Sequence, residues 1–134
     1  MFKPVSPTVY CLLDETQQRL VCSLSDPHDA PRLQKKWAKR ACATFSFKPP
    51  DTLYELVRDL LANPQVCAIV FDGEGPGRQV IQDFWCSKDV PEWGIAPDHL
   101  ALVRQFVDLY DGDCGGQVMQ PFWPKRLTYP LPPA

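Results

Sequence analysis

The residues best suited to chemistry lie in one glycine-rich loop near the middle of the chain. An apolar run, residues 66–71, ends in a carboxylate, and three glycines at alternating positions follow before a segment with helical spacing. This pattern is typical of a buried strand, a tight loop and a helix, and ligands of open α/β sheets gather where such strands end. Glycines let backbone amides approach a ligand, and a helix N-terminus favours an anion. The loop residues that we predict to bind a ligand are Asp72, Gly73, Glu74, Gly75, Gly77 and Arg78.

Charge in this loop restricts the ligand. Arg78 could clamp a carboxylate or phosphate, but Asp72 and Glu74 would repel a bare phosphate unless a metal or a ribose hydroxyl intervened. The spacing G-x-G-x-G is neither the dinucleotide fingerprint nor a P-loop. Tight-turn geometry explains the glycines equally well, so a binding loop and a purely structural turn both stay open.

The remaining acid–base, metal-binding and nucleophilic candidates are weaker. Asp72, Glu74 and Asp83 could act as acid–base groups or magnesium ligands, although we favour Asp83 as a surface residue and Asp72 as a loop cap. His28 and His99 lack metal-ligand spacing to any cysteine, and no two of the six cysteines are close enough for a C-x-x-C pair. We therefore predict no metal site and interpret most cysteines as buried free thiols.

Length and composition favour one small domain. The chain has 134 residues and a formal net charge of −2, which argues against a general nucleic-acid binder. No apolar run approaches the ~20 residues of a membrane span, and the first residues lack a signal-peptide core. We therefore expect a cytoplasmic protein that contacts neither nucleic acid nor membrane.

Hydrophobic periodicity places strands and helices around the loop. We expect an α/β fold, a Rossmann-like single domain whose mixed sheet carries an N-terminal β-hairpin and about four flanking helices. The predicted body is residues 1–120, and residues 121–134 form an extended Pro- and aromatic-rich tail that packs on the body or on a partner. The expected elements are the hairpin strands 8–13 and 19–24, a basic helix 32–40, a strand 41–47, a helix from Thr52 to 62 with a capping box, a strand 66–72, and helices 77–86 and 97–110.

The middle of the chain resembles a known family. Residues 52–73, with a helix, Asn63-Pro64, a strand and a glycine loop, are similar to the cytoplasmic domain of the cobamide-carrying subunit of tetrahydromethanopterin S-methyltransferase and to a related uncharacterised family of cyanobacteria and archaea. The resemblance implies a Rossmann-like fold and a cobamide whose cobalt a histidine holds upstream of the Asn-Pro helix. Here residues 44–51 contain no histidine, and the family's G-H-x-x-G-Q motif corresponds to Gly77, Arg78, Ile81 and Gln82. The resemblance thus implies the fold without the cobalt chemistry, and it adds Gln82 to the predicted ligand-binding residues.

Three functions follow from these observations, and the sequence leaves open whether the protein is an enzyme. The first is a small-ligand-binding module for a pterin, corrin or nucleotide at the glycine loop. The alternative is a non-catalytic interaction or scaffold protein that uses the tail, residues 122–133, or the basic helix, although such a helix is more often a solvated face. The second alternative is a metal-assisted enzyme that uses Asp72 and Glu74.

Overall fold

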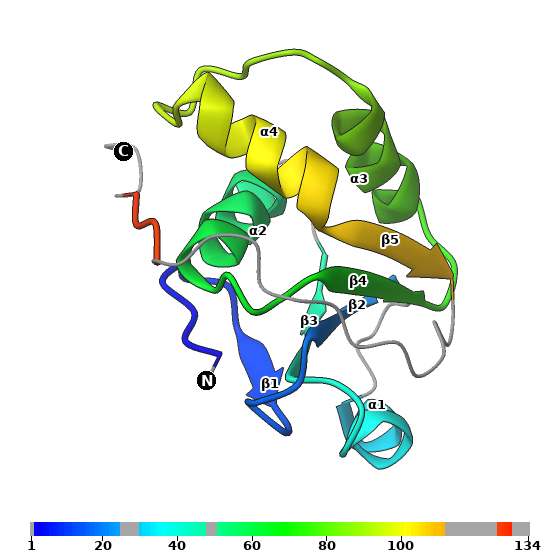
Figure 1. Cartoon of the computed structure of the whole chain (residues 1–134). Helices are drawn as coiled ribbons and strands as arrows, with labels where there is room; N and C mark the ends of the chain where they lie inside the picture. The colour runs from blue at the N-terminus through cyan, green and yellow to red at the C-terminus, as the bar shows by residue number, and fades with distance from the viewer. Residues whose placement is uncertain (1, 25–29, 48–50, 112–125, 130–134) are drawn as a thin grey trace.

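The protein is built on a five-stranded mixed sheet with helices on both faces (Figure 1). The computed structural model describes residues 2–24, 30–47, 51–111 and 126–129, and the statements below concern these residues. The strands are β1 (Tyr10–Leu12), β2 (Arg19–Ser23), β3 (Ala43–Ser46), β4 (Ala68–Asp72) and β5 (Asp108–Asp111), and the helices are α1 (Ala30–Trp37), α2 (Asp51–Ala62), α3 (Gly77–Cys86) and α4 (Pro97–Phe106). This arrangement confirms the α/β class expected from the sequence.

The strand order is β1-β3-β2-β4-β5, so the two N-terminal strands are present but do not pair with each other as a hairpin. β1 pairs antiparallel with β3, and the other neighbouring strands run parallel. The reason lies in β2, whose Leu20, Val21 and Cys22 are all completely buried. A strand that is apolar on both faces belongs in the centre of a parallel sheet. β1 is only partly buried, which suits the edge.

Alternating side chains divide the core between the two faces of the sheet. Leu20 of β2 and Ile69 of β4 pack in the larger cluster with α2, α3 and α4, whereas their neighbours Val21 and Val70 pack against α1. Figure 1 shows α1 alone on its side of the sheet and the other three described helices on the opposite side. None of the described helices is long and apolar enough to cross a membrane.

The last predicted helix is shorter than its sequence pattern suggests. We expected it to continue to Tyr110, but α4 ends at Phe106, Val107 is extended, and residues 108–111 form β5 beside β4. The apolar residues within 103–110 fit a helical stripe, but they also fit a strand. Leu109 packs with the larger cluster and Tyr110 with the α1 cluster, so the alternation of a strand is satisfied. The free edge of β4 decides between the two, because a strand there satisfies its backbone groups.

Both ends of the described chain are fastened to α2. Asp59, which is completely buried, accepts hydrogen bonds from the amides of Val5 (2.6 Å) and Ser6 (3.0 Å) and from the hydroxyl of Tyr10 (2.6 Å). Burial, together with the charge of Asp59, raises the pKa of Tyr10. Of the predicted tail, residues 126–129 are described, and the Leu127 amide donates to a carbonyl of α2. The other tail residues lie outside the described residues.

Candidate functional site

The glycine loop lies where the sheet changes its winding direction. β2 is followed by α1 on one face and leads to β3, whereas β4 is followed by α3 on the other face and leads to β5 (Figure 1). Adjacent parallel strands whose connections diverge in this way form a topological switch point, and ligands of open α/β sheets bind in the crevice at its carboxyl edge. A cavity of about 240 Å³ opens at this edge, and its lining residues are Lys36, Phe71, Asp72, Gly73, Glu74, Arg78 and Asp111.

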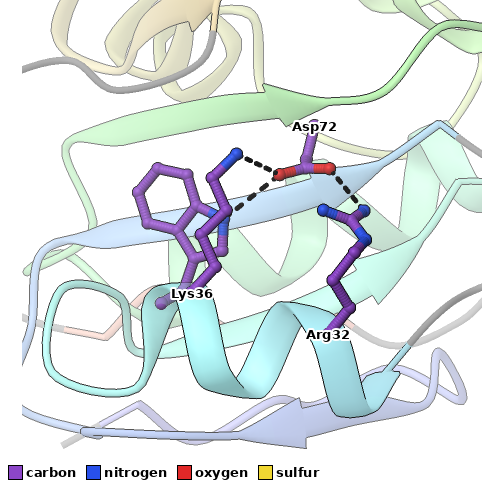
Figure 2. A network of polar contacts seen from close by, with 4 residues as sticks. Arg32, Lys36 and Asp72 are labelled. Carbon is purple, nitrogen blue, oxygen red and sulfur yellow. Dashed lines mark hydrogen bonds and ion pairs between the residues drawn. The ribbon is translucent and has the colours of Figure 1, made fainter.

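Asp72, the last residue of β4, is held by three donors from α1. Its carboxylate accepts hydrogen bonds from Arg32 Nη2 at 2.8 Å, Lys36 Nζ at 3.1 Å and Trp37 Nε1 at 3.3 Å. Figure 2 shows Arg32 and Lys36 reaching the carboxylate of Asp72 from one helix. The Asp72 side chain is only 4% exposed, whereas those of Arg32 and Lys36 are 46% and 45% exposed. The network therefore joins α1 to the carboxyl end of β4 at the wall of the cavity.

The same contacts fix the protonation state of Asp72. Burial alone raises its pKa, but the hydrogen bonds from Arg32, Lys36 and Trp37, with the charge of Lys36, outweigh burial and lower the pKa from its usual value. The carboxyl group is therefore ionised at neutral pH and has no proton to donate. Three of the roughly four hydrogen bonds that a carboxylate can accept are already made. These contacts assign Asp72 to positioning the cations of α1.

Arg78 brings a second cation to the cavity, from α3. Its guanidinium pairs with Asp111, lies 3.9 Å from the carboxylate of Glu74, and sits 5.7 Å from the ring centre of Phe71. The side chains of Asp111 and Glu74 are 65% and 91% exposed. Ion pairs with such exposed partners are worth little. A ligand group could therefore replace either carboxylate on Arg78 at small cost.

Each glycine of the loop has its own structural reason. Gly73 adopts φ 91°, a conformation that other residues rarely take. A Cβ on Gly75 would lie 2.6 Å from the carbonyl oxygen of Leu24, and one on Gly77 would lie 2.5 Å from a ring carbon of Phe47. Backbone conformation and close packing thus require these glycines whether or not a ligand binds.

The structure gathers part of the predicted site and adds residues to it. Of the predicted residues, Asp72, Gly73, Glu74 and Arg78 line the cavity, whereas Gly75, Gly77 and Gln82 do not. Lys36, Phe71 and Asp111 complete the lining. Lys36 belongs to the basic helix seen in the sequence, but nothing local connects it with a loop more than thirty residues away. Asp111 directly follows the predicted helix 97–110, so no local pattern indicates that it lies at the sheet edge beside Arg78.

The other polar candidates lie elsewhere or serve packing. Asp83 accepts a hydrogen bond from Gln79 at 2.6 Å on the exposed side of α3. His99 Nδ1 contacts the Tyr129 hydroxyl, and His28 lies outside the described residues. Within the described ranges no three His, Cys, Asp or Glu side chains are grouped so that they could hold a metal ion. Cys22, Cys42 and Cys67 are buried free thiols, as expected, whereas Cys11, for which we also expect burial, is only partly buried. Cys86 is exposed.

Comparison with protein-family models, with curated proteins and with solved structures finds no match to this chain. The geometry of the cavity and the sequence motifs are thus the basis for a functional assignment.

Proposed function

We propose that the protein is a small-ligand-binding module whose site is the cavity at the carboxyl end of β4. The observation that carries the proposal is a charged cavity at the topological switch point of the sheet, where ligands of this class of fold bind. Lys36 of α1 and Arg78 of α3 line this cavity, and Gly73 of the glycine loop lines it as well. The proposal is for binding and assigns no reaction.

The charges of the lining favour a ligand with both hydrogen-bond donors and acceptors. Lys36 and Arg78 supply positive charge, Glu74 and Asp111 supply negative charge, and Asp72 is neutralised by α1. A polyphosphate would be attracted by the cations but repelled by the exposed carboxylates. A neutral heterocycle with amino and carbonyl groups on its edge could donate to the carboxylates and accept from the cations.

The size of the cavity narrows the ligand further. Pockets for drug-sized ligands usually enclose about 300–1,000 Å³, and this cavity encloses about 240 Å³. Among a pterin, a corrin and a nucleotide, we favour the bicyclic ring of a pterin or the base of a nucleoside over a corrin macrocycle. Phe71 also lines the cavity beside Arg78, but its side chain is almost completely buried in the core, so the polar side chains would carry the recognition.

We also propose kinship with the cytoplasmic domain of the cobamide-carrying subunit of tetrahydromethanopterin S-methyltransferase. What supports it is the order of helix, Asn63-Pro64, strand, glycine loop and helix, which corresponds here to α2, β4 and α3. The cobalt-ligating histidine of that family has no counterpart in residues 44–51. The proposed kinship therefore concerns the fold and a ligand-binding role, without a cobamide.

Isothermal titration calorimetry with 6-methylpterin, guanosine, adenosine monophosphate and cobinamide tests the proposal. We expect the pterin or guanosine to bind and cobinamide not to bind. Arg78→Gln should weaken binding by about tenfold or more, because a charged hydrogen bond is lost. Lys36→Gln should also weaken it, whereas the matched control Lys35→Gln, on the same helix but outside the cavity lining, should not. Absence of binding by every probe, or equal affinities of all three variants, would contradict the proposal.

A further inference from the structure

Two apolar residues fix which side of α1 faces the sheet. Leu33 and Trp37 lie one turn apart, are completely buried, and pack against Val21 and Val70. The opposite side of the helix must therefore face away from the sheet. The polar side chains of the helix therefore lie beside or opposite this buried side.

The polar residues of α1 and of the turn that follows it are strongly positive. Residues 30–40 contain five Lys or Arg residues and no Asp or Glu. We call these five residues the basic face of α1: Arg32, Lys35, Lys36 and Lys39 are exposed, and Arg40 is half-buried over the ring of Trp37. The cations lie within three turns of chain, so their potentials add.

Ion pairs among the residues that the structure describes leave part of the basic face without a carboxylate partner. Asp72 accepts hydrogen bonds from Arg32 and Lys36 and supplies a single negative charge. No ion pair joins Lys35 or Lys39 to a carboxylate in the part of the chain that the structure describes. Cations in the last turn stabilise a helix, which accounts for Lys35. It does not account for Lys39, which lies beyond the helix end.

The rest of the chain has the opposite charge. Outside the basic face, nine Lys and Arg residues stand against sixteen Asp and Glu residues. A long polyanion such as a nucleic acid would be repelled by this remainder, and the buried Trp37 ring has no face free for base stacking. The eight residues of α1 extend for only about 12 Å. About four residues of an extended partner segment would span that length.

We propose that the basic face of α1 is a docking surface for a short acidic segment of a partner protein. The proposal is based on charge complementarity. Lys35 and Lys39 would bind the acidic side chains of the partner, because neither forms an ion pair with a carboxylate of the described residues. The complex is weak and sensitive to salt, because exposed pairs are screened within about 8 Å at physiological ionic strength. The surface is separate from the ligand cavity apart from Lys36, which borders both.

Fluorescence anisotropy with a fluorescein-labelled oligoglutamate peptide tests this assignment on the full chain. The test variant is Lys35→Glu with Lys39→Glu. The control is Lys3→Glu with Lys88→Glu, which changes the net charge equally at two exposed lysines on other parts of the surface. We expect the test variant to weaken binding about tenfold at low salt and the control to change it by less than about twofold.

Two results would overturn the proposal. Equal weakening by the two double variants would mean that only net charge matters and that no docking surface exists. Tighter binding of a single-stranded RNA oligomer or of anionic phospholipid vesicles than of the peptide, with the same dependence on Lys35 and Lys39, would assign the surface to another class of partner. Because both lysines lie outside the cavity lining, pterin binding in the test variant should be unchanged.

Discussion

Replacing Asp72 by asparagine tests the network that joins α1 to β4. The substitution keeps the shape of the side chain and removes the charge that three donors share. Removing one partner of a buried ion pair costs about 3–5 kcal/mol. Here Arg32 and Lys36 are nearly half exposed and can turn to water, so each of their pairs is closer to a surface pair of about 0–1 kcal/mol.

The remaining cost comes from the site itself. The amide of the introduced asparagine would stand in a position that is 4% exposed, beside two cations that repel its NH₂ group. We therefore expect Asp72→Asn to lower the free energy of unfolding by about 2 kcal/mol. For a chain of this length that corresponds to a fall in Tm of about 6–8 °C. Urea denaturation at neutral pH measures the change, and the matched control is Glu74→Gln, whose side chain is 91% exposed and should change stability by less than about 0.5 kcal/mol.

The pH dependence gives this prediction a second readout. The pKa of Asp72 in the folded state lies below its value in the unfolded chain, which is about 3.9. The stabilisation by the carboxylate is therefore complete at neutral pH and is lost as the pH falls below about 4 and through the folded-state pKa. The difference between wild type and Asp72→Asn should shrink over that window. A difference that is no larger than for Glu74→Gln, or that stays constant down to the lowest pH at which both proteins fold, would refute the reasoning.

Three further predictions concern the loop, the N-terminal segment and the thiols. Gly75→Ala should lower the free energy of unfolding by about 2–3 kcal/mol because a Cβ has no room there. Gly94→Ala, at positive φ in open space, should lower it by about 1 kcal/mol, and chemical denaturation measures both. Asp59→Asn should lower the free energy of unfolding by about 3 kcal/mol, because hydrogen bonds to a buried charged group are stronger than neutral ones. It should also speed amide hydrogen exchange in the segment before β1, since that segment donates to the carboxylate; unchanged exchange would count against this attachment. Alkylation followed by peptide mass spectrometry should label Cys86 at least about tenfold faster than Cys42, because burial raises the pKa of Cys42 to about 12. Comparable labelling in the native protein would disprove the assigned burial.

Local patterns predicted the elements that surround the site. The capping box at Thr52 and the stripe of leucines predicted α2, and the apolar run with a terminal carboxylate predicted β4. Three alternating glycines predicted the turn into α3. These signals depend on contacts within a few residues, such as side chains one helical turn apart.

The order of the strands could not be predicted in the same way. The polar turn after β1 suggested a hairpin, but pairing depends on which strand buries both of its faces, and that strand is β2. The segment at Tyr110 likewise satisfied a helical and a strand pattern. Only the unpaired edge of β4, a feature of the assembled sheet, made it a strand.

The sequence by itself determined the fold class, the glycine loop and the presence of charge beside it. Its cations and carboxylates were visible as residue types, yet their pairing was not, because Arg32 and Asp72 are forty residues apart. The tertiary structure decided that Asp72 binds the cations of α1, that Lys36 and Asp111 join the cavity, and that Lys35 and Lys39 lie outside its lining. The physical reason is that most of the helices and strands, β5 excepted, follow from short-range contacts, whereas the charges that meet at a site are set by which strands become neighbours.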